Sequence, residues 1–219
     1  MVLFKAVATP SKGTTPNMEW VQLESGLTAL RKNVTWDQIR NELDTIVVCK
    51  FFDVPVSKVI VFDEHSLGSV VSYNKRYTQI HGYELCSHCL EEYHKVLPQR
   101  VYDDLLKVCF VDCVCGQTDR NSGNIAFLKN VEGAIVGVCP LYDNIVSFGY
   151  DIVDDCLLAP TMDKVWYDEE VFKWLSENQK DFNSLRLKYE SQEFTKLTSN
   201  LYNRSWVLEQ RERLLSSLD

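Results

Sequence analysis

Hydrophobic and polar positions divide the chain into a strand-rich first part and a longer, mainly helical second part. Short apolar runs rich in β-branched residues predict strands at 2–7, 56–63, 67–74, 124–129 and 134–139. Glu132 and Gly133 separate the last two runs and predict a hairpin turn. The Pro-, Gly- and Thr-rich stretch 9–17 predicts an exposed loop, whereas 20–30 is ambiguous.

Helical periodicity is clearest over 35–53, where Ile39, Leu43, Ile46, Val47 and Lys50 follow at three-to-four spacing. Thr35 is the expected N-cap, with Gln38 placed to close a capping box. Pro55 places the helix end near Asp53. Similar periodicity predicts further helices at 85–96, 98–114, 168–189 and 193–218.

Composition narrows the classes of function. The chain has 219 residues, of which 45% are hydrophobic, and a net charge of -8. This charge, with Lys and Arg scattered along the chain, argues against a nucleic-acid partner. The apolar start is interrupted at Lys5, so we expect no signal peptide, no membrane association and a cytoplasmic location.

The cysteines fit a reducing compartment. Cys49, Cys109, Cys139 and Cys156 sit singly in apolar runs, as buried free thiols do. A zinc site is the alternative, and its ligands would come from Cys86, His88, Cys89, His94, Cys113 and Cys115. The C-x-C spacing of the last pair favours semi-buried thiols instead.

The stretch "CGQTDRNSGNIAFLKN", residues 115–130, carries unusual polarity between two apolar segments. Buried carboxylates and amides persist only when they are paired, solvated in a cleft or bound to a metal. Asp119 and Asn124 are five residues apart, and Asp143 follows the next hairpin, so all three can converge. Protein kinases use this arrangement to orient a hydroxyl and to hold Mg²⁺. The alternative is ordinary capping and turn formation by these residue types.

The sequence of this region resembles the catalytic region of the HipA-like serine/threonine kinases. The pattern of that family is G-N-x-D-R-H-x-x-N-x-G-F-L, followed after a hairpin by P-L-Y-D-x-G. A related pattern occurs in phosphoinositide kinases. By this resemblance, Asp119 is the catalytic aspartate, and Asn124 and Asp143 are magnesium ligands. We expect Arg120 to form a structural ion pair beneath the loop. The family pattern changes at three positions, which here are Gln117, Asn121 and Ile145.

The resemblance extends upstream. It places Glu42 where a helix glutamate pairs with the nucleotide-binding lysine, and it places a hinge that meets adenine at Val70, Val71, Ser72 and Tyr73. Lys5 is the lysine that we expect to grip the phosphates, with a simple edge-strand lysine as the alternative. We expect no room for a glycine-rich strand pair ahead of it.

The resemblance implies an α+β, two-lobed, protein-kinase-like fold. A reduced strand-rich N-terminal lobe would span 1–75, with its hinge near 70–75. A larger helical lobe would span 76–219, with a catalytic loop at 115–124 and a metal-binding hairpin at 124–148. The implied function is ATP- and Mg²⁺-dependent phosphoryl transfer to a serine or threonine of a protein, in a setting with an antitoxin-like or regulatory protein partner. The alternative is an inactive kinase-fold module that binds nucleotide or regulates a partner.

Overall fold

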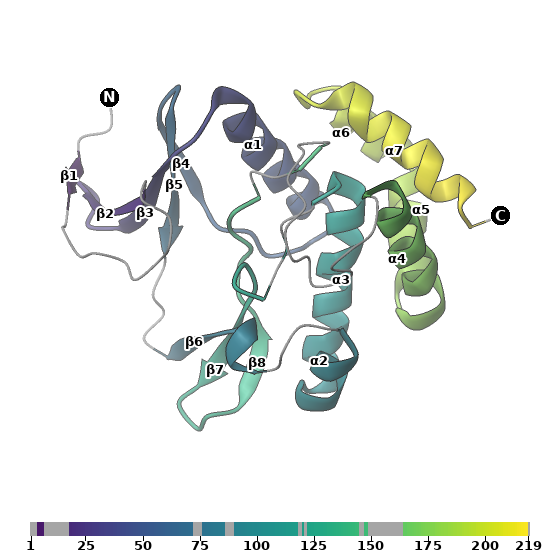
Figure 1. Cartoon of the computed structure of the whole chain (residues 1–219), viewed down its shortest axis with the longest axis horizontal. Coiled ribbons are helices and arrows are strands. Elements are labelled where there is room, and N and C mark those ends of the chain that lie inside the picture. The colour runs from purple at the N-terminus through teal and green to yellow at the C-terminus, as the bar shows by residue number, and fades with distance from the viewer. Residues whose placement is uncertain are drawn as a thin grey trace.

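The computed structural model describes residues 4–6, 18–71, 76–85, 90–117, 120, 122–144, 147–148 and 164–218. A five-stranded sheet and helix α1 occupy one side of the molecule, and a three-stranded sheet lies below them (Figure 1). The remaining helices form the other side, with α3 at their centre. The predicted division into a strand-rich first part and a helical second part is confirmed.

The five-stranded sheet has the strand order β1-β2-β3-β5-β4 and is antiparallel throughout. Its strands are β1 (Phe4–Ala6), β2 (Met18–Leu23), β3 (Thr28–Asn33), β4 (Val59–Asp63) and β5 (Ser66–Val71). The ambiguous segment 20–30 is therefore a hairpin, whose turn contains Gly26 at φ 78°. Strands β1 and β2 pair ahead of β3, and Lys5 lies on β1 itself.

Helix α1 (Trp36–Phe51) begins and ends as predicted. The Thr35 hydroxyl accepts a hydrogen bond from the Gln38 N–H at 3.3 Å, and the Gln38 side chain accepts from the Thr35 N–H at 2.9 Å. The residues that α1 buries agree only in part with the three-to-four pattern of its sequence. Ile39 is buried, but Lys50 is exposed, and the residues buried with Ile39 are Asn41, Glu42, Asp44, Thr45, Val48 and Cys49.

The second sheet has the order β6-β7-β8 and links the two halves of the chain. It contains β6 (Tyr77–His81), β7 (Ala126–Asn130) and β8 (Ile135–Val138). The hairpin of β7 and β8 is confirmed, with Gly133 at φ 87° in its turn. Strand β6 was not expected, because its exposed pattern of polar and apolar residues gives no strong signal of a buried face.

The second part of the chain contains α2 (Leu90–Val96), α3 (Gln99–Cys115), α4 (Lys164–Asn178), α5 (Phe182–Glu190), α6 (Gln192–Thr198) and α7 (Arg204–Ser216). Each of the two long C-terminal helices that periodicity predicts is broken into two. The second break precedes α7. Ser191 explains the start of α6, because its hydroxyl accepts the Phe194 N–H at 3.1 Å.

The main hydrophobic core surrounds α3. Phe110 is fully buried there, with ring centroids 5.3 Å from Phe52, the C-cap residue of α1, 5.4 Å from Phe172 of α4 and 6.0 Å from Tyr189 of α5. Aromatic rings bury large apolar areas and prefer such tilted contacts. Helix α1 is therefore packed between the five-stranded sheet and the helical part.

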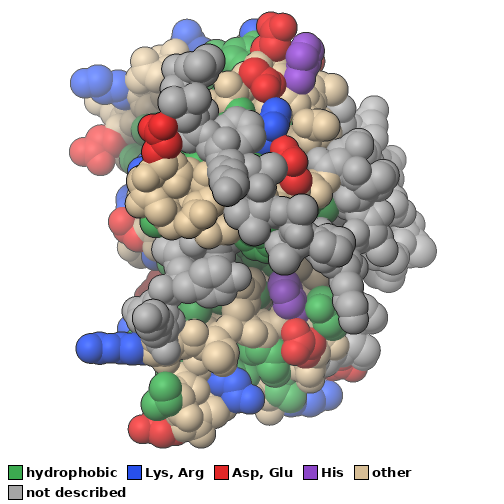
Figure 2. Space-filling view, turned by 90° about the vertical axis from the view of Figure 1, so that its left-hand side faces the viewer, with side chains coloured by type: hydrophobic (Ala, Val, Ile, Leu, Met, Phe, Trp, Pro, Cys, Tyr) green, Lys and Arg blue, Asp and Glu red, His purple; other side chains and the backbone are tan. Residues whose placement is uncertain are grey.

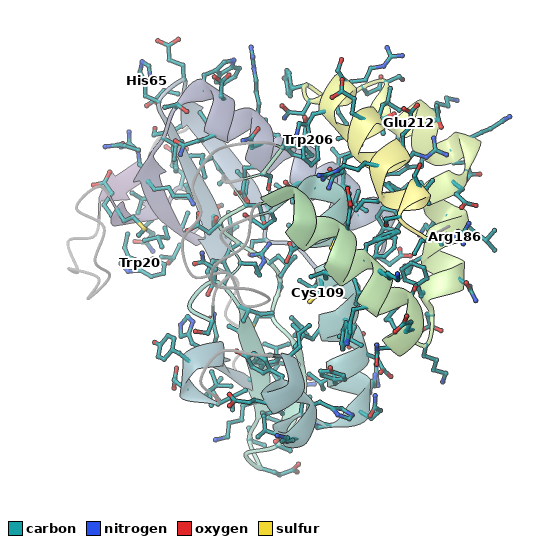
Figure 3. All side chains as sticks on the ribbon, turned by 45° about the vertical axis from the view of Figure 1, so that its right-hand side comes forward. Trp20, His65, Cys109, Arg186, Trp206 and Glu212 are labelled. Atoms are coloured by element: carbon teal, nitrogen blue, oxygen red, sulfur yellow. The ribbon has the colours of Figure 1, made fainter. Side chains whose placement is uncertain are left out.

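Helix α7 lies against the end of α3 (Figure 3). Trp206 packs edge-on against Phe148, with centroids 5.6 Å apart. A Cβ atom on Gly116 would come within 2.4 Å of the Trp206 ring, and Gly116 has φ 56°. Glycine is required here both by the left-handed backbone that ends α3 and by this close contact.

The surface and the thiols agree with the sequence. Lys and Arg side chains lie scattered among Asp and Glu on the face in Figure 2. Cys49, Cys109 and Cys139 are buried free thiols, as expected, and Cys113 and Cys115 are too. Cys156 lies outside the described residues. No helix in the described part of the chain is long and apolar enough to cross a membrane.

Candidate functional site

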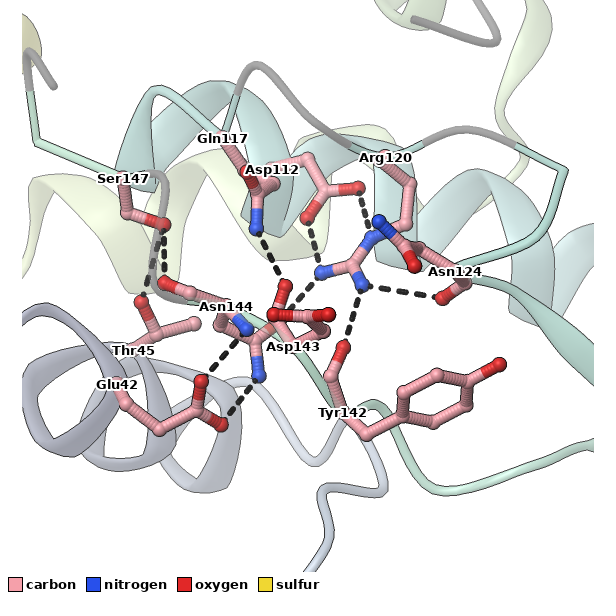
Figure 4. A network of polar contacts seen from close by, with 10 residues as sticks. All are labelled: Glu42, Thr45, Asp112, Gln117, Arg120, Asn124, Tyr142, Asp143, Asn144 and Ser147. Carbon is pink, nitrogen blue, oxygen red and sulfur yellow. Dashed lines mark hydrogen bonds and ion pairs between the residues drawn. The ribbon is translucent and has the colours of Figure 1, made fainter. Parts of the chain in front are cut away.

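The centre of the candidate site is the Arg120 guanidinium, which is 2% exposed. Its Nε and Nη2 atoms donate to the two carboxylate oxygens of Asp112 on α3, both at 3.1 Å. Its Nη1 atom donates to the main-chain carbonyls of Asn124 at 3.3 Å and Tyr142 at 3.1 Å (Figure 4). One nitrogen thus joins the segment before β7 to the segment after β8. The expected structural ion pair of Arg120 is confirmed.

Arg120 keeps its charge although it is buried. Burial lowers the pKa of the guanidinium, but the facing Asp112 carboxylate more than reverses this effect, so the pKa lies above its ordinary value. A buried pair of this kind holds a unique geometry only if its remaining donors are also satisfied. The carbonyls and the Asn144 side chain satisfy them here.

Asp143 lies at this junction, and its backbone is left-handed, with φ 59°. Its side chain is 26% exposed and forms an ion pair with the ammonium of Lys32 on β3. Its main-chain carbonyl accepts a hydrogen bond from Gln117 Nε2 at 3.3 Å. A non-glycine residue in the left-handed region is strained and persists only where its surroundings hold it. Such strain is found most often at functional sites.

Asn144 is fully buried beside Glu42 of α1, which is also fully buried. The Asn144 N–H donates to Glu42 Oε2 at 2.6 Å, and its Nδ2 atom donates to Oε1 at 3.0 Å. On the other side, Arg120 Nη2 donates to Asn144 Oδ1 at 2.5 Å. Asn144 therefore joins α1 to the guanidinium (Figure 4).

The electrostatics of Glu42 differ from those of a surface carboxylate. Burial raises its pKa above the ordinary value, although the charge of Lys32 and the hydrogen bonds from Asn144 oppose this shift. The nearby Asp143 carboxylate adds to the rise. The resemblance implies a direct pairing of Glu42 with the lysine. In the structure both of its oxygens accept hydrogen bonds from Asn144, and Lys32 pairs with Asp143.

The structure brings together some of the predicted site residues. Arg120 joins the main-chain carbonyl of Asn124 to that of Tyr142, the residue before Asp143. Glu42 lies behind this junction and is bonded to Asn144. Asp119, the expected catalytic residue, lies outside the described residues, and Asn121 and Ile145 lie outside them as well.

The expected nucleotide-binding residues are less well described. Val70 and Val71 end β5, and Val70 is buried. Ser72 and Tyr73 lie outside the described residues. Lys5 is on β1, the edge strand of the five-stranded sheet, and only its backbone is described.

Sequence reasoning missed Lys32, the lysine that contacts Asp143. The available signal was its position: "TALRKN" directly precedes the capping box at Thr35 and follows a turn at Gly26. Once 18–33 is interpreted as a hairpin, Lys32 is a lysine on the last strand before the helix. Asn144 and Asp112 were also missed, because nothing local distinguishes them from turn and helix-surface residues.

The donor set suits a hard cation. Asp143 has a carboxylate and Asn124 has an amide oxygen, which are donors that Mg²⁺ prefers, and Mg²⁺ in nucleotide sites needs only one or two protein ligands beside the phosphates. Within the described ranges, no group of three or more His, Cys, Asp or Glu side chains is arranged to hold a metal. For the zinc alternative, Cys86, His88 and Cys89 lie outside those ranges.

No family model matches the sequence, and no curated protein shows significant similarity to it. Among solved structures, the chain is similar to the Helicobacter pylori proinflammatory kinase CtkA, with a TM-score of 0.61 and 11% identity over 98% of this chain and 93% of that one. The chain has a protein-kinase-like fold. It is α+β and two-lobed, so the fold that the HipA-like resemblance implies is confirmed.

Two further likenesses are weaker. One is to HipA of Shewanella oneidensis in a complex with HipB and its operator DNA, with a TM-score of 0.49, 12% identity, and coverage of 98% of this chain and 63% of that one. The other is to the Golgi casein kinase with Mn/ADP bound, with a TM-score of 0.46, 13% identity, and coverage of 95% and 71%. The fold assignment rests on CtkA.

Proposed function

We propose that the protein is a kinase-type phosphotransferase that uses ATP and Mg²⁺ to phosphorylate a serine or threonine of a protein substrate. The observation that carries the proposal is the ion pair of Lys32 with Asp143, on a left-handed residue between the five-stranded sheet and the helical part. A lysine on the strand before the helix, facing a carboxylate that follows a hairpin, is the charge arrangement that kinases use around nucleotide phosphates and metal.

Each residue has a role in this proposal. Asp143 and Asn124 would hold the metal, which when bound neutralises the charge of the phosphates. Lys32 would contact the phosphates as a charged donor, and in their absence it compensates the charge of Asp143. Asp119 would orient the acceptor hydroxyl and accept its proton. Glu42 would act from behind, through Asn144.

The remaining parts of the proposal rest on the sequence. The two lobes would be 1–75 and 76–219, and adenine would lie beside residues 70–73. The segment 9–17, which the sequence predicts to be a loop and which contains Gly13, would cover the phosphates with its main-chain N–H groups. The buried free thiols favour a cytosolic location. The resemblance of residues 115–143 to HipA-like kinases also implies an antitoxin-like or regulatory protein partner.

The first prediction tests this function with purified protein, ATP labelled at the γ-phosphate and Mg²⁺. We expect transfer or slow ATP hydrolysis that is lost in Asp119→Asn. Lys32→Met should weaken ATP binding about tenfold or more, because a charge-assisted hydrogen bond contributes roughly 1.5–3 kcal/mol. Lys5→Met is the matched control and should bind like wild type. Calorimetric titration measures the affinities.

Two outcomes would contradict the proposal in different ways. Binding of Mg·ATP without any phosphate release, the same in wild type and Asp119→Asn, would favour an inactive nucleotide-binding module. Loss of affinity in Lys5→Met together with normal affinity in Lys32→Met would move the phosphate site to β1 and remove the observation on which the proposal rests.

A further inference from the structure

Two peptide groups flank Asp143, and their orientations determine its φ and ψ. The first joins Tyr142 to Asp143, and its carbonyl accepts the Nη1 donor of Arg120 at 3.1 Å. This hydrogen bond connects the first peptide to the ion pair of Arg120 with Asp112, and therefore to α3. The guanidinium is buried and bound on several sides, so it is a rigid donor.

The second peptide group joins Asp143 to Asn144 and is bound at both ends. Its carbonyl accepts from Gln117 Nε2 at 3.3 Å, and its N–H donates to Glu42 Oε2 at 2.6 Å. Gln117 follows α3 and Glu42 belongs to α1, so this peptide is held between two helices. With both peptides fixed, Asp143 is kept in the left-handed region and its Cα–Cβ direction is set.

The Asn144 side chain completes this arrangement. Its amide donates to Glu42 at 3.0 Å and accepts from Arg120 at 2.5 Å, so it connects the two side chains that hold the flanking peptides. We propose that Asn144 is a positioning residue, which keeps the Asp143 carboxylate aimed at the metal by linking Glu42 to Arg120. This role rests on the proposed function of Asp143 as a metal ligand.

An amide is the side chain that this position requires. It faces a carboxylate on one side and a guanidinium on the other, and an amide has both a donor and an acceptor at its end. A carboxylate at 144 would face the Glu42 carboxylate within hydrogen-bonding distance. An alanine would leave two buried charges each without one partner, which is costly.

Exchanging the amide at position 144 with the carboxylate at position 42 tests this role. Asn144→Asp replaces a donor to Glu42 with a second negative charge. The double variant Glu42→Gln/Asn144→Asp keeps the net charge and the number of donors and acceptors but reverses the direction of the hydrogen bond. Gln210→Ala is the control, because Gln210 is 3% exposed and its Nε2 atom donates to the Cys113 carbonyl at 2.8 Å, on the α7 side of α3.

The measurement is the affinity for ATP in the presence of Mg²⁺ and in the presence of EDTA. Asn144→Asp should weaken Mg·ATP binding by roughly 10- to 100-fold, the usual effect of losing a group that orients a metal ligand. Binding of ATP in EDTA should change much less. The double variant should regain most of the lost affinity. Hydrogen exchange in the peptide 141–148 should rise in Asn144→Asp and fall again in the double variant.

The proposal is overturned if Asn144→Asp binds Mg·ATP like Gln210→Ala, or if affinity falls equally with and without Mg²⁺, as a general loss of structure would produce. It is also overturned if the double variant recovers neither affinity nor exchange protection. Absence of Mg²⁺-dependent binding in wild type is a different result. That result refutes the proposed function, and the positioning role falls with it.

Discussion

At the scale of single residues, the site depends on contacts that link distant positions of the chain. Lys32 and Asp143 are 111 positions apart, and Glu42 and Asn144 are 102 apart. The motif around 115–143 predicted the ion pair of Arg120, and it proposes roles for Asn124 and Asp143 because a family pattern carries such roles with it. Lys32 and Asn144 belong to no pattern that the sequence displays. Their importance follows from three-dimensional neighbours, which local propensity does not encode.

The second prediction concerns pH and Glu42. Its pKa is raised in the folded state above the ordinary 4.5, mainly by burial. The folded state therefore binds this proton more tightly than the unfolded state does. The stability contributed by the protonated group is complete below about pH 4.5 and is lost as pH rises through the folded pKa. Glu42→Gln cannot lose a proton, so its free energy of unfolding should fall less steeply over this window.

Urea unfolding at a series of pH values measures this difference. Glu42→Gln also loses one of the two hydrogen bonds that the Glu42 oxygens accept from Asn144, a constant cost of roughly 1–3 kcal/mol. Relative to wild type, the variant should gain stability from acid to neutral pH. A difference between the two proteins that stays constant would show that folding does not shift the pKa of Glu42, and a difference that moves the other way would show that folding lowers it.

At the scale of elements, the sequence predicted the existence of α1 and both its ends, but not its buried face. Capping residues and Pro55 act locally, so they are visible in the sequence. The buried face carries Asn41, Glu42, Asp44 and Thr45 because these side chains have partners on other segments. Periodicity assumes that buried means apolar, and it fails where polar groups are satisfied by distant loops.

The same face of α1 holds the start of α7. The Asp44 carboxylate accepts from the N–H groups of Tyr202 at 3.2 Å and Asn203 at 2.8 Å, and from the Asn203 side chain at 3.0 Å. Asn41 accepts from Asn203 at 3.1 Å and donates to the Ser147 carbonyl at 2.9 Å. Helix α1 therefore connects α7 with the segment that follows Asp143.

The third prediction tests this connection. Asp44→Ala removes a carboxylate that accepts three hydrogen bonds, so it should lower the free energy of unfolding by about 1.5–3 kcal/mol. Hydrogen exchange at 201–206 should rise more than exchange in α3. Glu209→Ala, an exposed acidic residue on α7, is the control and should change stability by less than about 0.5 kcal/mol. Equal effects of the two variants would show that Asp44 does not hold α7.

At the scale of the whole molecule, the resemblance predicted the architecture well and the periodicity predicted most of its elements. The β2–β3 hairpin was the main omission, and it adds Lys32 on β3 as a candidate beside Lys5 on β1. Its signal was weak, because a two-stranded hairpin that is half exposed carries few buried positions in each strand. The candidate site lies where the five-stranded sheet, α1 and the helical part meet (Figures 1 and 4).

The last prediction uses the stability of the whole chain as the measure of ligand binding. A ligand that binds only the folded state, at about one hundred times its Kd, stabilises it by about 2.7 kcal/mol, which for a chain of this size raises Tm by roughly 5–10 °C. Mg·ATP should produce such a shift in wild type. Asp143→Asn should abolish the part of the shift that depends on Mg²⁺, because asparagine tolerates the left-handed backbone but lacks the charge. Its Tm without ligand should fall as well, since Lys32 is 11% exposed and loses its ionic partner. A Mg²⁺-dependent shift that persists in Asp143→Asn would place the metal elsewhere and contradict the site assembled around Arg120.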